Sequence, residues 1–500
     1  MISRSFSWLA EHSKPLLLSG NNVRVLSAPG EYLQWLKSQL VSVKWRILLS
    51  SLYLGTGYLE KELVGLIADS LRTNSSLQCS IVLDSLRGHR GNPNSVSVLG
   101  KLIQEFPHQF SLYMYHTPSL RGSLKRALPQ RINEVVGLQH TKLHVFDNNV
   151  LMTGANLSHD YFTNRQDRYI SFDSSPSLAN YLSKVHETLS QHSFLVKPDS
   201  SLANPQAMRG LNPLQSKRNS NIFKKSFYEE MQTIIQSKTH AAETHSHTAK
   251  SHSHHTTKTH ANTNTESCIT SETRSHTPST DYESIGMESE ESDTVVYPLV
   301  QMGEYDIRQD EEVTAGLLSN VSANERLCIA SGYFNLPHVH KRSLLDSKGH
   351  ISILASSPQC MGFYGAQGPA GSIPQLYSNL TAQFLRDSCP HGSRIRYYEY
   401  HRQEWTYHAK GLWYYLQGMN LPSLTLIGSS NYGYRSLKRD LECQVAIVTR
   451  NKRLQLALDK EREQLYNYGT LLSLEDMKAS RDHRPSLWVK GITPLLKYYV

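Results

Sequence analysis

The chain has 500 residues, of which 39% are hydrophobic and 19% are charged. This length exceeds what one hydrophobic core usually organises, so a small single module is excluded and two or three domains or a duplicated unit are expected. The apolar share also excludes a chain that is disordered throughout. With 52 Lys and Arg against 43 Asp and Glu, the net charge is +9, which favours anionic partners such as phosphate esters, nucleic acid or acidic lipid.

The beginning of the chain and the cysteines bear on its compartment. The first ten residues, MISRSFSWLA, are basic and rich in serine, so residues 1–21 fit an organelle transit segment, although a frayed terminus fits equally well. The six cysteines contain no CxxC pair, which favours inert thiols in a reducing compartment. No apolar run approaches the roughly 18 residues of a spanning helix, so we expect a soluble or peripheral protein.

Residues 22–195 have the pattern of a first α/β half. An apolar β-type run at 46–57 is followed by a helical stretch at 60–72, and short buried-strand patterns follow at 79–85 and 111–116. Alternation of strands with helices indicates an α/β sandwich.

Residues 196–295 interrupt this pattern. The part from about 238 to 280 has eight histidines among Ser and Thr and no apolar periodicity, which predicts a disordered linker. A weaker alternative is metal binding by these histidines.

Residues 296–470 repeat the order of the first half, and 471–500 form a C-terminal tail. β-type runs recur at 326–337, 351–357 and 396–401, and a charged closing helix is expected over 454–466. The repetition predicts two copies of one α/β unit.

Each half then reaches a His-x-Lys element, within 134–160 in the first half and 402–435 in the second. The first has His140 and Lys142, and the second has His408 and Lys410. Alternation along a strand puts residues i and i+2 on one face, so each pair can address one anion. A Gly/Ser/Asn turn follows in each half and carries Asn156 in the first copy and Ser429 and Asn431 in the second. Eleven residues beyond each Asn stands an acid, Asp167 (156 to 167) and Glu442 (431 to 442).

On these motifs the sequence resembles the phospholipase D superfamily, in which a duplicated H-x-K-x4-D motif forms one active site at a pseudo-twofold axis. The segments SLYLGTG, TNRQDRY and NYGYRS make it similar, more closely, to the eukaryotic CDP-diacylglycerol:glycerol-3-phosphate 3-phosphatidyltransferases, the phosphatidylglycerophosphate synthase family. The resemblance implies two tandem phospholipase D-like α/β sandwich halves around one site. It also implies transfer of a phosphatidyl group from CDP-diacylglycerol to glycerol 3-phosphate with release of CMP, on the way to phosphatidylglycerol and cardiolipin.

The resemblance assigns His140 as nucleophile and His408 as acid and base, an order that the residues alone do not fix. Asp167 would orient His408, and Glu442 would orient His140. Lys142 and Lys410 would stabilise charge on the phosphoryl oxygens.

One position departs from the superfamily pattern. Asp147 completes the first motif and is a candidate catalytic residue, but Tyr415 stands at the equivalent position of the second copy. Asp147 is therefore alternatively a local structural acceptor.

Further candidates would bind substrate phosphates. They are Asn156, Ser429, Asn431, Arg87, Arg90 and Arg435. The histidine scheme requires no metal, and a divalent ion that manages the substrate diphosphate stays open.

The implied setting is the matrix side of the mitochondrial inner membrane, with peripheral contact to anionic lipid. Two segments are candidates for that contact: the basic stretch 209–228 with Phe223 and Phe227, and the C-terminal PSLWVKGITPLLKYYV. A phosphodiesterase or nuclease of the same fold, or a non-catalytic scaffold for acidic phospholipid, are the alternatives. No arm rich in Lys and Arg favours nucleic acid, and the duplication makes an active monomer possible.

Overall fold

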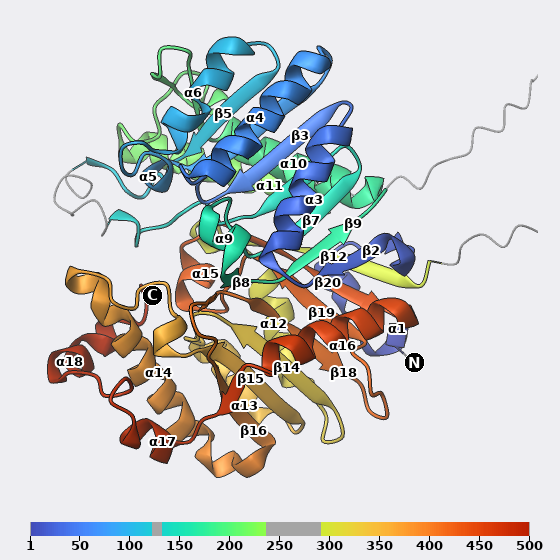
Figure 1. The fold of residues 1–500 in the computed structure, drawn as a ribbon, viewed down its shortest axis with the longest axis vertical. Helices are drawn as coiled ribbons and strands as arrows, with labels where there is room; N and C mark the ends of the chain where they lie inside the picture. Colours follow the sequence, from blue (N-terminus) through green and yellow to red (C-terminus); the bar gives the residue numbers. More distant parts are fainter. Residues whose placement is uncertain (1, 123–132, 237–291, 500) are drawn as a thin grey trace, which may run out of the picture. The chain divides into compact units, whose positions relative to one another are not determined.

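The computed structural model describes residues 2–122, 133–236 and 292–499, which form two β-sheets with helices packed on them (Figure 1). The His-rich segment at 238–280, expected to be a linker or a metal-binding stretch, lies outside the described residues. In Figure 1 the first sheet runs from blue to green and most of the second from yellow to red.

The first sheet belongs to the first half of the chain. Its nine strands have the order β11-β10-β5-β4-β3-β6-β7-β9-β2. Their bounds are Val23–Leu26 (β2), Arg46–Ser51 (β3), Gln78–Asp84 (β4), Phe110–Tyr115 (β5), Leu143–Phe146 (β6), Asn149–Thr153 (β7), Tyr169–Phe172 (β9), Phe194–Val196 (β10) and Leu202–Ala203 (β11). The β3, β4 and β5 strands are parallel to one another, whereas β6, β7 and β9 are joined antiparallel.

The second sheet has ten strands, and its main path is β1-β12-β20-β19-β18-β14-β15-β16-β21. The bounds are Leu16–Leu18 (β1), Thr294–Met302 (β12), Ile307–Arg308 (β13, paired with β12), Arg326–Ser331 (β14), His350–Ser356 (β15), Ile395–Tyr400 (β16), Lys410–Tyr415 (β18), Leu424–Gly428 (β19), Glu442–Thr449 (β20) and Gly469–Leu471 (β21).

The two sheets share one topology. The path β5-β4-β3-β6-β7-β9-β2 of the first corresponds strand for strand to β16-β15-β14-β18-β19-β20-β12 of the second. In both, the first three strands are parallel and the remainder are antiparallel. The predicted duplication and the mixed α/β class are thereby confirmed.

Three hydrophobic cores follow from this arrangement. Helices α3 (Pro29–Ser42), α4 (Tyr58–Thr73) and α6 (Ser95–Glu105) pack on one face of the first sheet. Helices α12 (Gln309–Ser319), α13 (His338–Asp346) and α14 (Ile373–Ser388) pack on the second sheet. A central core joins both sheets through α10 (Pro176–Gln191), α11 (Lys217–Gln236) and α16 (Lys452–Tyr466), so the halves share their largest apolar cluster.

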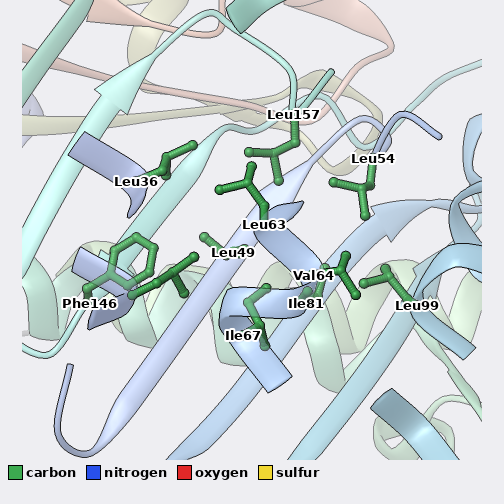
Figure 2. A pocket seen from close by; sticks show the side chains of 11 residues that line it. Leu36, Leu49, Leu54, Leu63, Val64, Ile67, Ile81, Leu99, Phe146 and Leu157 are labelled. Atoms are coloured by element: carbon green, nitrogen blue, oxygen red, sulfur yellow. The ribbon is translucent and has the colours of Figure 1, made fainter. Parts of the chain in front are cut away.

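The outer core of the first half contains a small apolar cavity between α3, α4 and the sheet (Figure 2). Leucine side chains dominate its lining, with Leu36, Leu63, Leu157 and Phe146 among them. With no polar group to hold a water or a ligand, this cavity belongs to the packing of the core.

Three segments differ from the expected half boundaries. Within residues 1–21, β1 pairs antiparallel with β12, and Phe6 and Leu9 are buried in the core of the second half. Within 196–295, β11 and α11 are ordered parts of the first half. Within 471–500, α17 (Leu474–Ala479) and α18 (Leu487–Leu496) pack on α14.

Helix α11 corrects one sequence-based prediction. Phe223 and Phe227, the aromatic side chains proposed to reach a membrane, are fully buried in the central core because they lie on the inner face of the helix. Phe223 and Phe227 are therefore not available for contact with a membrane. Among the described residues, none of the helices is both long enough and apolar enough to cross a bilayer.

Candidate active site

Two short backbone pairings across the halves build the site. Gln139 pairs in parallel with Leu441, and β17 (Thr406–Tyr407) pairs in parallel with β8 (Arg165–Gln166). In both cases the residue before the histidine meets the residue before the acid of the opposite half. The backbone N–H of His140 donates to Leu441 O at 3.0 Å, and that of His408 donates to Gln166 O at 2.8 Å. The pseudo-twofold relation therefore brings each histidine to the predicted acid.

His140 and Glu442 form the first pair. Nδ1 of His140 lies 2.9 and 3.0 Å from the two carboxylate oxygens of Glu442, and both side chains are buried. Ser436 donates to Glu442 Oε1 at 2.8 Å, which fixes the carboxylate in turn. Because Nδ1 faces the acid, Nε2 is left as the ring atom that can meet a substrate.

His408 and Asp167 form the second pair, with Nδ1 and Oδ2 2.6 Å apart. The other ring nitrogen, Nε2, lies 3.3 Å from the hydroxyl of Tyr161, which also accepts a hydrogen bond from Asn156 Nδ2 at 3.0 Å. Tyr161 comes from α9 (His159–Thr163), and its ring packs edge-on against the imidazole. The two histidines thus differ in the surroundings of Nε2.

Both motif lysines are buried beside their histidines. Lys142 Nζ donates to His140 O at 2.6 Å, and Lys410 Nζ donates to His408 O at 2.8 Å. Lys410 also lies 3.8 Å from Asp167. A Cβ on Gly154, in the turn after β7, would stand 2.8 Å from both Lys410 Nζ and Asp167 Oδ1, so a larger residue here would displace the side chains beside His408.

Burial sets the protonation preferences of these groups. Desolvation, followed by the neighbouring lysine, holds the pKa of His140 and of His408 well below the ordinary value. Burial raises the pKa of Glu442 to about 7 and that of Asp167 to about 6. Burial lowers the pKa of Lys142 to about 7. Both imidazoles are therefore neutral near pH 7 in the absence of substrate.

Asp147 lies outside this cluster, which corrects its assignment as a candidate catalytic residue. It follows β6 at the end remote from His140, and its carboxylate accepts the backbone N–H groups of Lys44, Trp45 and Arg46 at 2.8–3.1 Å. At the equivalent position, the last residue of β18, the hydroxyl of Tyr415 donates to Asp459 at 2.6 Å. Because this position serves the fold in both halves, the missing second acid does not affect the site.

The predicted phosphate ligands of the turns divide into two kinds. Asn156 and Asn431 each bury an Oδ1 atom without a hydrogen-bond partner among the described residues, and Asn156 Nδ2 donates to Tyr161 at 3.0 Å. Because Oδ1 only accepts, a phosphate oxygen would have to be bound by the Nδ2 groups. Ser429 is different, because its hydroxyl is engaged with the backbone of Cys443 at 3.0 and 3.2 Å. A further hydrogen bond from Ser429 lowers the pKa of Glu442. Ser429 therefore supports Glu442, and its assignment as a phosphate ligand stays a prediction.

The three predicted arginines gather around Glu134. Arg87 and Arg90 lie 3.4 and 3.2 Å from its carboxylate, and Arg435 donates to its backbone oxygen at 3.3 Å. Arg435 also pairs with Asp440 at 3.1 Å. Two guanidinium groups thus face the Glu134 carboxylate, and the third lies between its backbone oxygen and Asp440. The three side chains are a quarter to a third exposed, so an anion can reach them.

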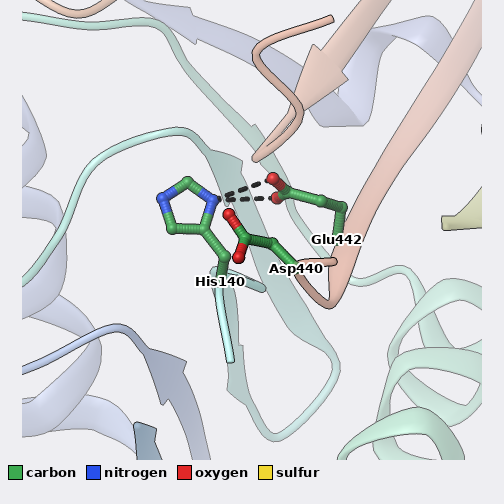
Figure 3. A group of neighbouring side chains, drawn as sticks. All are labelled: His140, Asp440 and Glu442. Carbon is green, nitrogen blue, oxygen red and sulfur yellow. Dashed lines mark hydrogen bonds and ion pairs between the residues drawn. The ribbon is translucent and has the colours of Figure 1, made fainter. Parts of the chain in front are cut away.

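His140, Asp440 and Glu442 also satisfy a distance test for metal ligands, since their donor atoms lie within 4.8 Å of one another (Figure 3). Their donors are already used, however. Glu442 holds His140 and Ser436, while Asp440 accepts from Arg435 and from the backbone N–H of Leu138. Glu442 orients the imidazole, Asp440 holds Arg435 and Lys142 lies beside them, so we assign no cation to this group.

Sequence reasoning missed several residues that the structure brings to the histidines. Tyr161 contacts His408, Tyr333 packs edge-on on its other side at 5.8 Å, and Arg165 lies over the Tyr161 ring at 4.8 Å. Arg165 lies within the TNRQDRY segment used for the resemblance, and Tyr161 stands two residues before it, so that segment carried a signal. No spacing rule pointed to Tyr333, because its approach to His408 depends on tertiary packing.

Comparisons with known proteins agree with this geometry. No family model matches the chain. A mitochondrial CDP-diacylglycerol–glycerol-3-phosphate 3-phosphatidyltransferase of Gallus gallus is 39% identical over 503 residues, covering 99% of this chain and 86% of that protein. The human enzyme of that name is 38% identical with the same coverage. The Schizosaccharomyces pombe enzyme is 32% identical, and the match covers 95% of this chain and 94% of that protein.

A crystal structure of phosphatidylserine synthase from Haemophilus influenzae has the same fold. It superposes with a TM-score of 0.70 at 18% identity, covering all of this chain and 99% of that one. With relatives this similar over nearly the full length, the resemblance stated from the motifs is confirmed. The chain belongs to the family of CDP-diacylglycerol–glycerol-3-phosphate 3-phosphatidyltransferases.

Proposed function

We propose that this chain transfers the phosphatidyl group of CDP-diacylglycerol to glycerol 3-phosphate, giving phosphatidylglycerophosphate and CMP in phosphatidylglycerol and cardiolipin biosynthesis. One observation carries the proposal. Two histidines from different halves enter one site, and each has Nδ1 held by an acid of the opposite half. Two such histidines supply the nucleophile and the acid that exchange at phosphorus requires. Membership of the family supplies the substrates.

In the first step Nε2 of His140 attacks the phosphorus that carries diacylglycerol. A P–N bond forms, the P–O bond to CMP breaks, and the leaving phosphate oxygen takes a proton from Nε2 of His408. The geometry supports this order because Nε2 of His140 has no hydrogen-bond partner among the described side chains, whereas that of His408 meets the Tyr161 hydroxyl.

In the second step His408 acts as a base. A hydroxyl of glycerol 3-phosphate gives its proton to Nε2 of His408 while its oxygen attacks phosphorus, and the P–N bond to His140 breaks. The enzyme returns to its initial protonation state, so the cycle balances. Phosphatidyl-His140 is the intermediate of this scheme.

The cations have separate tasks in the scheme. Lys142 and Lys410 neutralise charge on the oxygens of the reacting phosphorus. Arg87, Arg90 and Arg435 bind the remaining phosphates, namely that of CMP or of glycerol 3-phosphate. Asn156 and Asn431 donate N–H groups of Nδ2 to phosphate oxygens, and Asn156 uses the N–H that does not bond to Tyr161. A divalent ion that binds together with the substrate diphosphate is compatible with this scheme and is not required by it.

Protonation of His408 is coupled to substrate binding in this scheme. Burial and Lys410 keep the empty imidazole neutral, yet the first step needs it protonated. The negative diphosphate supplies a nearby charge that raises the pKa of His408. Substrate binding therefore draws in the proton that catalysis uses.

The same proposal extends to location. Two of the animal relatives carry "mitochondrial" in their names, and a diacylglycerol substrate has to be reached from a bilayer. We place the chain peripherally on the matrix side of the mitochondrial inner membrane.

Product analysis tests the proposal. The purified chain is incubated with CDP-diacylglycerol in detergent micelles, with and without glycerol 3-phosphate, beside His140→Ala and His408→Ala. His108→Ala, at an exposed histidine of the first half, is the matched control. We expect CMP release that depends on glycerol 3-phosphate, yields phosphatidylglycerophosphate, persists in the control and vanishes in both site variants.

Two other results would contradict the proposal. CMP release that is independent of the acceptor would indicate a hydrolase. A complete lack of release by a folded wild-type chain would indicate a nuclease or a non-catalytic lipid scaffold.

A further inference from the structure

The solvent-exposed side of helix α18 is apolar. Only Val489 and Thr493, one turn apart, are buried against the protein. On the outer side Leu487 is 85% exposed, Leu495 71% and Trp488 53%. A surface helix ordinarily turns polar residues outward, so an apolar outer side marks a contact with something other than water.

This apolar side is held firmly in place. Val489 packs with Met361 and Leu380 in a separate apolar cluster under α18. Asn379 of α14 donates to Thr493 Oγ1 at 2.9 Å, and Asn335 donates to the backbone oxygen of Lys497 at 2.6 Å. The exposed side chains therefore stand on a supported element.

The same cluster leads to the catalytic histidine. Tyr333 packs against it and lies edge-on to His408, with ring centroids 5.8 Å apart. The ring of Phe363 lies 6.0 Å from that of Tyr333, and Phe363 and Tyr364 are 36% and 53% exposed. The apolar cluster under α18, which lies at the left of Figure 1, thus connects through Tyr333 to the exposed Phe363 on one side and to His408 on the other.

The charge around α18 has one dominant sign. Between residues 478 and 499 there are five basic residues and one acid, Asp482. The basic residues are Lys478, Arg481, Arg484, Lys490 and Lys497. Apolar side chains surrounded by Lys and Arg match the interface of a bilayer that contains anionic lipid.

We infer that α18 and the Phe363–Tyr364 loop form the surface by which this protein docks on an anionic lipid bilayer, with the active site facing the membrane. We call this surface the α18 face: Leu487, Trp488, Leu495, Phe363 and Tyr364. The inference rests on the proposed function for its purpose, because docking here lets a headgroup reach His408 while the acyl chains stay near lipid. It deepens that function by assigning the contact to one face.

Vesicle binding and turnover together test the inference. The full chain is sedimented with phosphatidylcholine vesicles that contain phosphatidylglycerol, without any CDP-diacylglycerol. Leu487→Ser combined with Leu495→Ser should weaken partitioning about tenfold or more, because two leucines no longer enter the interface. Arg481→Glu combined with Lys490→Glu should weaken it as well and reduce its dependence on salt.

A matched control changes exposed apolar residues elsewhere. Val41 on α3 is 79% exposed and Leu456 on α16 is 52% exposed, and Val41→Ser with Leu456→Ser should leave partitioning within twofold. All of these positions are already exposed, so the variants should fold, as circular dichroism will show. Equal binding by the α18 variant and the control would overturn the inference. So would a change of oligomeric state in the α18 variant with vesicle binding intact, since the face would then be a protein interface.

Turnover separates this inference from the proposed function. On vesicles that contain CDP-diacylglycerol, the α18 variant should lose activity in parallel with binding, yet match the wild type in detergent micelles. A wild type that binds vesicles but does not turn over in micelles would refute the proposed function and leave the docking surface supported.

Discussion

Nδ1 of His140 donates to the carboxylate of Glu442 at 2.9 Å, although the two residues stand 302 positions apart in the chain. The equivalent contact joins His408 to Asp167 at 2.6 Å. Each half therefore supplies the imidazole of one pair and the acid of the other. Any movement of one half relative to the other therefore changes the distance from each histidine to its acid in both pairs at once.

Replacing Glu442 by Gln should reduce kcat by about 100- to 10,000-fold with the fold intact, because an amide no longer fixes the tautomer and orientation of His140. The measurement is kcat in detergent micelles together with the melting temperature. Asp147→Asn is the matched control, since that residue completes the sequence motif but holds only backbone N–H groups. Equal losses of kcat in the two variants would contradict the assignment.

Replacing Tyr161 by Phe should move the pH profile. Its hydroxyl faces Nε2 of neutral His408 and stabilises that neutral form, so removing it should raise the pKa of His408. Because the first step needs protonated His408, the basic limb of kcat/KM should shift upward, by up to about one pH unit. Tyr161→Leu distinguishes loss of the hydroxyl from loss of the ring. If the basic limb of the kcat/KM profile does not shift in Tyr161→Phe, Tyr161 does not stabilise neutral His408.

Replacing Arg168 by Met should destabilise the protein strongly. Arg168 is fully buried and holds both oxygens of Glu461 at 2.8 and 2.9 Å. Loss of the arginine leaves a buried carboxylate unpaired, which costs about 3–5 kcal/mol of unfolding free energy. Adding Glu461→Gln should recover part of the loss.

The contrasting control is Arg24→Met, which breaks the exposed pair with Asp173 and should cost no more than about 1 kcal/mol. Urea midpoints of the four proteins give the comparison. Similar midpoints for Arg168→Met and Arg24→Met would contradict the burial argument.

Replacing His186 by Gln should change how stability depends on pH. Burial lowers the pKa of His186 to about 3 from an ordinary 6.5, and its ring lies between the hydroxyls of Ser50 and Ser80. Below pH 6.5 the unfolded chain binds this proton and the folded chain does not. The stability from neutral burial is therefore present above 6.5 and lost as the pH falls towards 3.

In that window the wild type should lose about 1.4 kcal/mol per pH unit more than His186→Gln. Unfolding free energies at several pH values between 7 and 4 provide the test. If the unfolding free energies of the two proteins fall in parallel with pH, His186 is not the source of the pH dependence of stability.

Local patterns were sufficient for much of the fold. The apolar runs at 46–57 and 326–337 became β3 and β14, since short buried strands are encoded by their own residues. The pairing of Asp167 with His408 needed the matching offsets in the two halves together with the family resemblance. Tyr333 and Tyr161 could not be placed, because contacts with an imidazole from another element depend on tertiary packing.

Motif position alone does not show what a side chain contacts. Ser429 and Asp147 stand at motif positions, yet nearby backbone groups bond to the hydroxyl of Ser429 and to the carboxylate of Asp147. A motif identifies which residues stand near a turn and not which way they face. The same limit applies to Phe223 and Phe227 of α11, which the sequence suggests for a membrane contact and which are buried.

Strand β1 gives the chain an interleaved architecture. It precedes the first sheet in sequence, yet it completes the edge of the second by pairing with β12. A cut anywhere between 237 and 291 would therefore release fragments that do not correspond to the two halves, because the N-terminal fragment keeps an edge strand of its partner's sheet. Such fragments would have to reassemble to restore either histidine–acid pair, and the protein would behave as a split enzyme whose pieces complement each other.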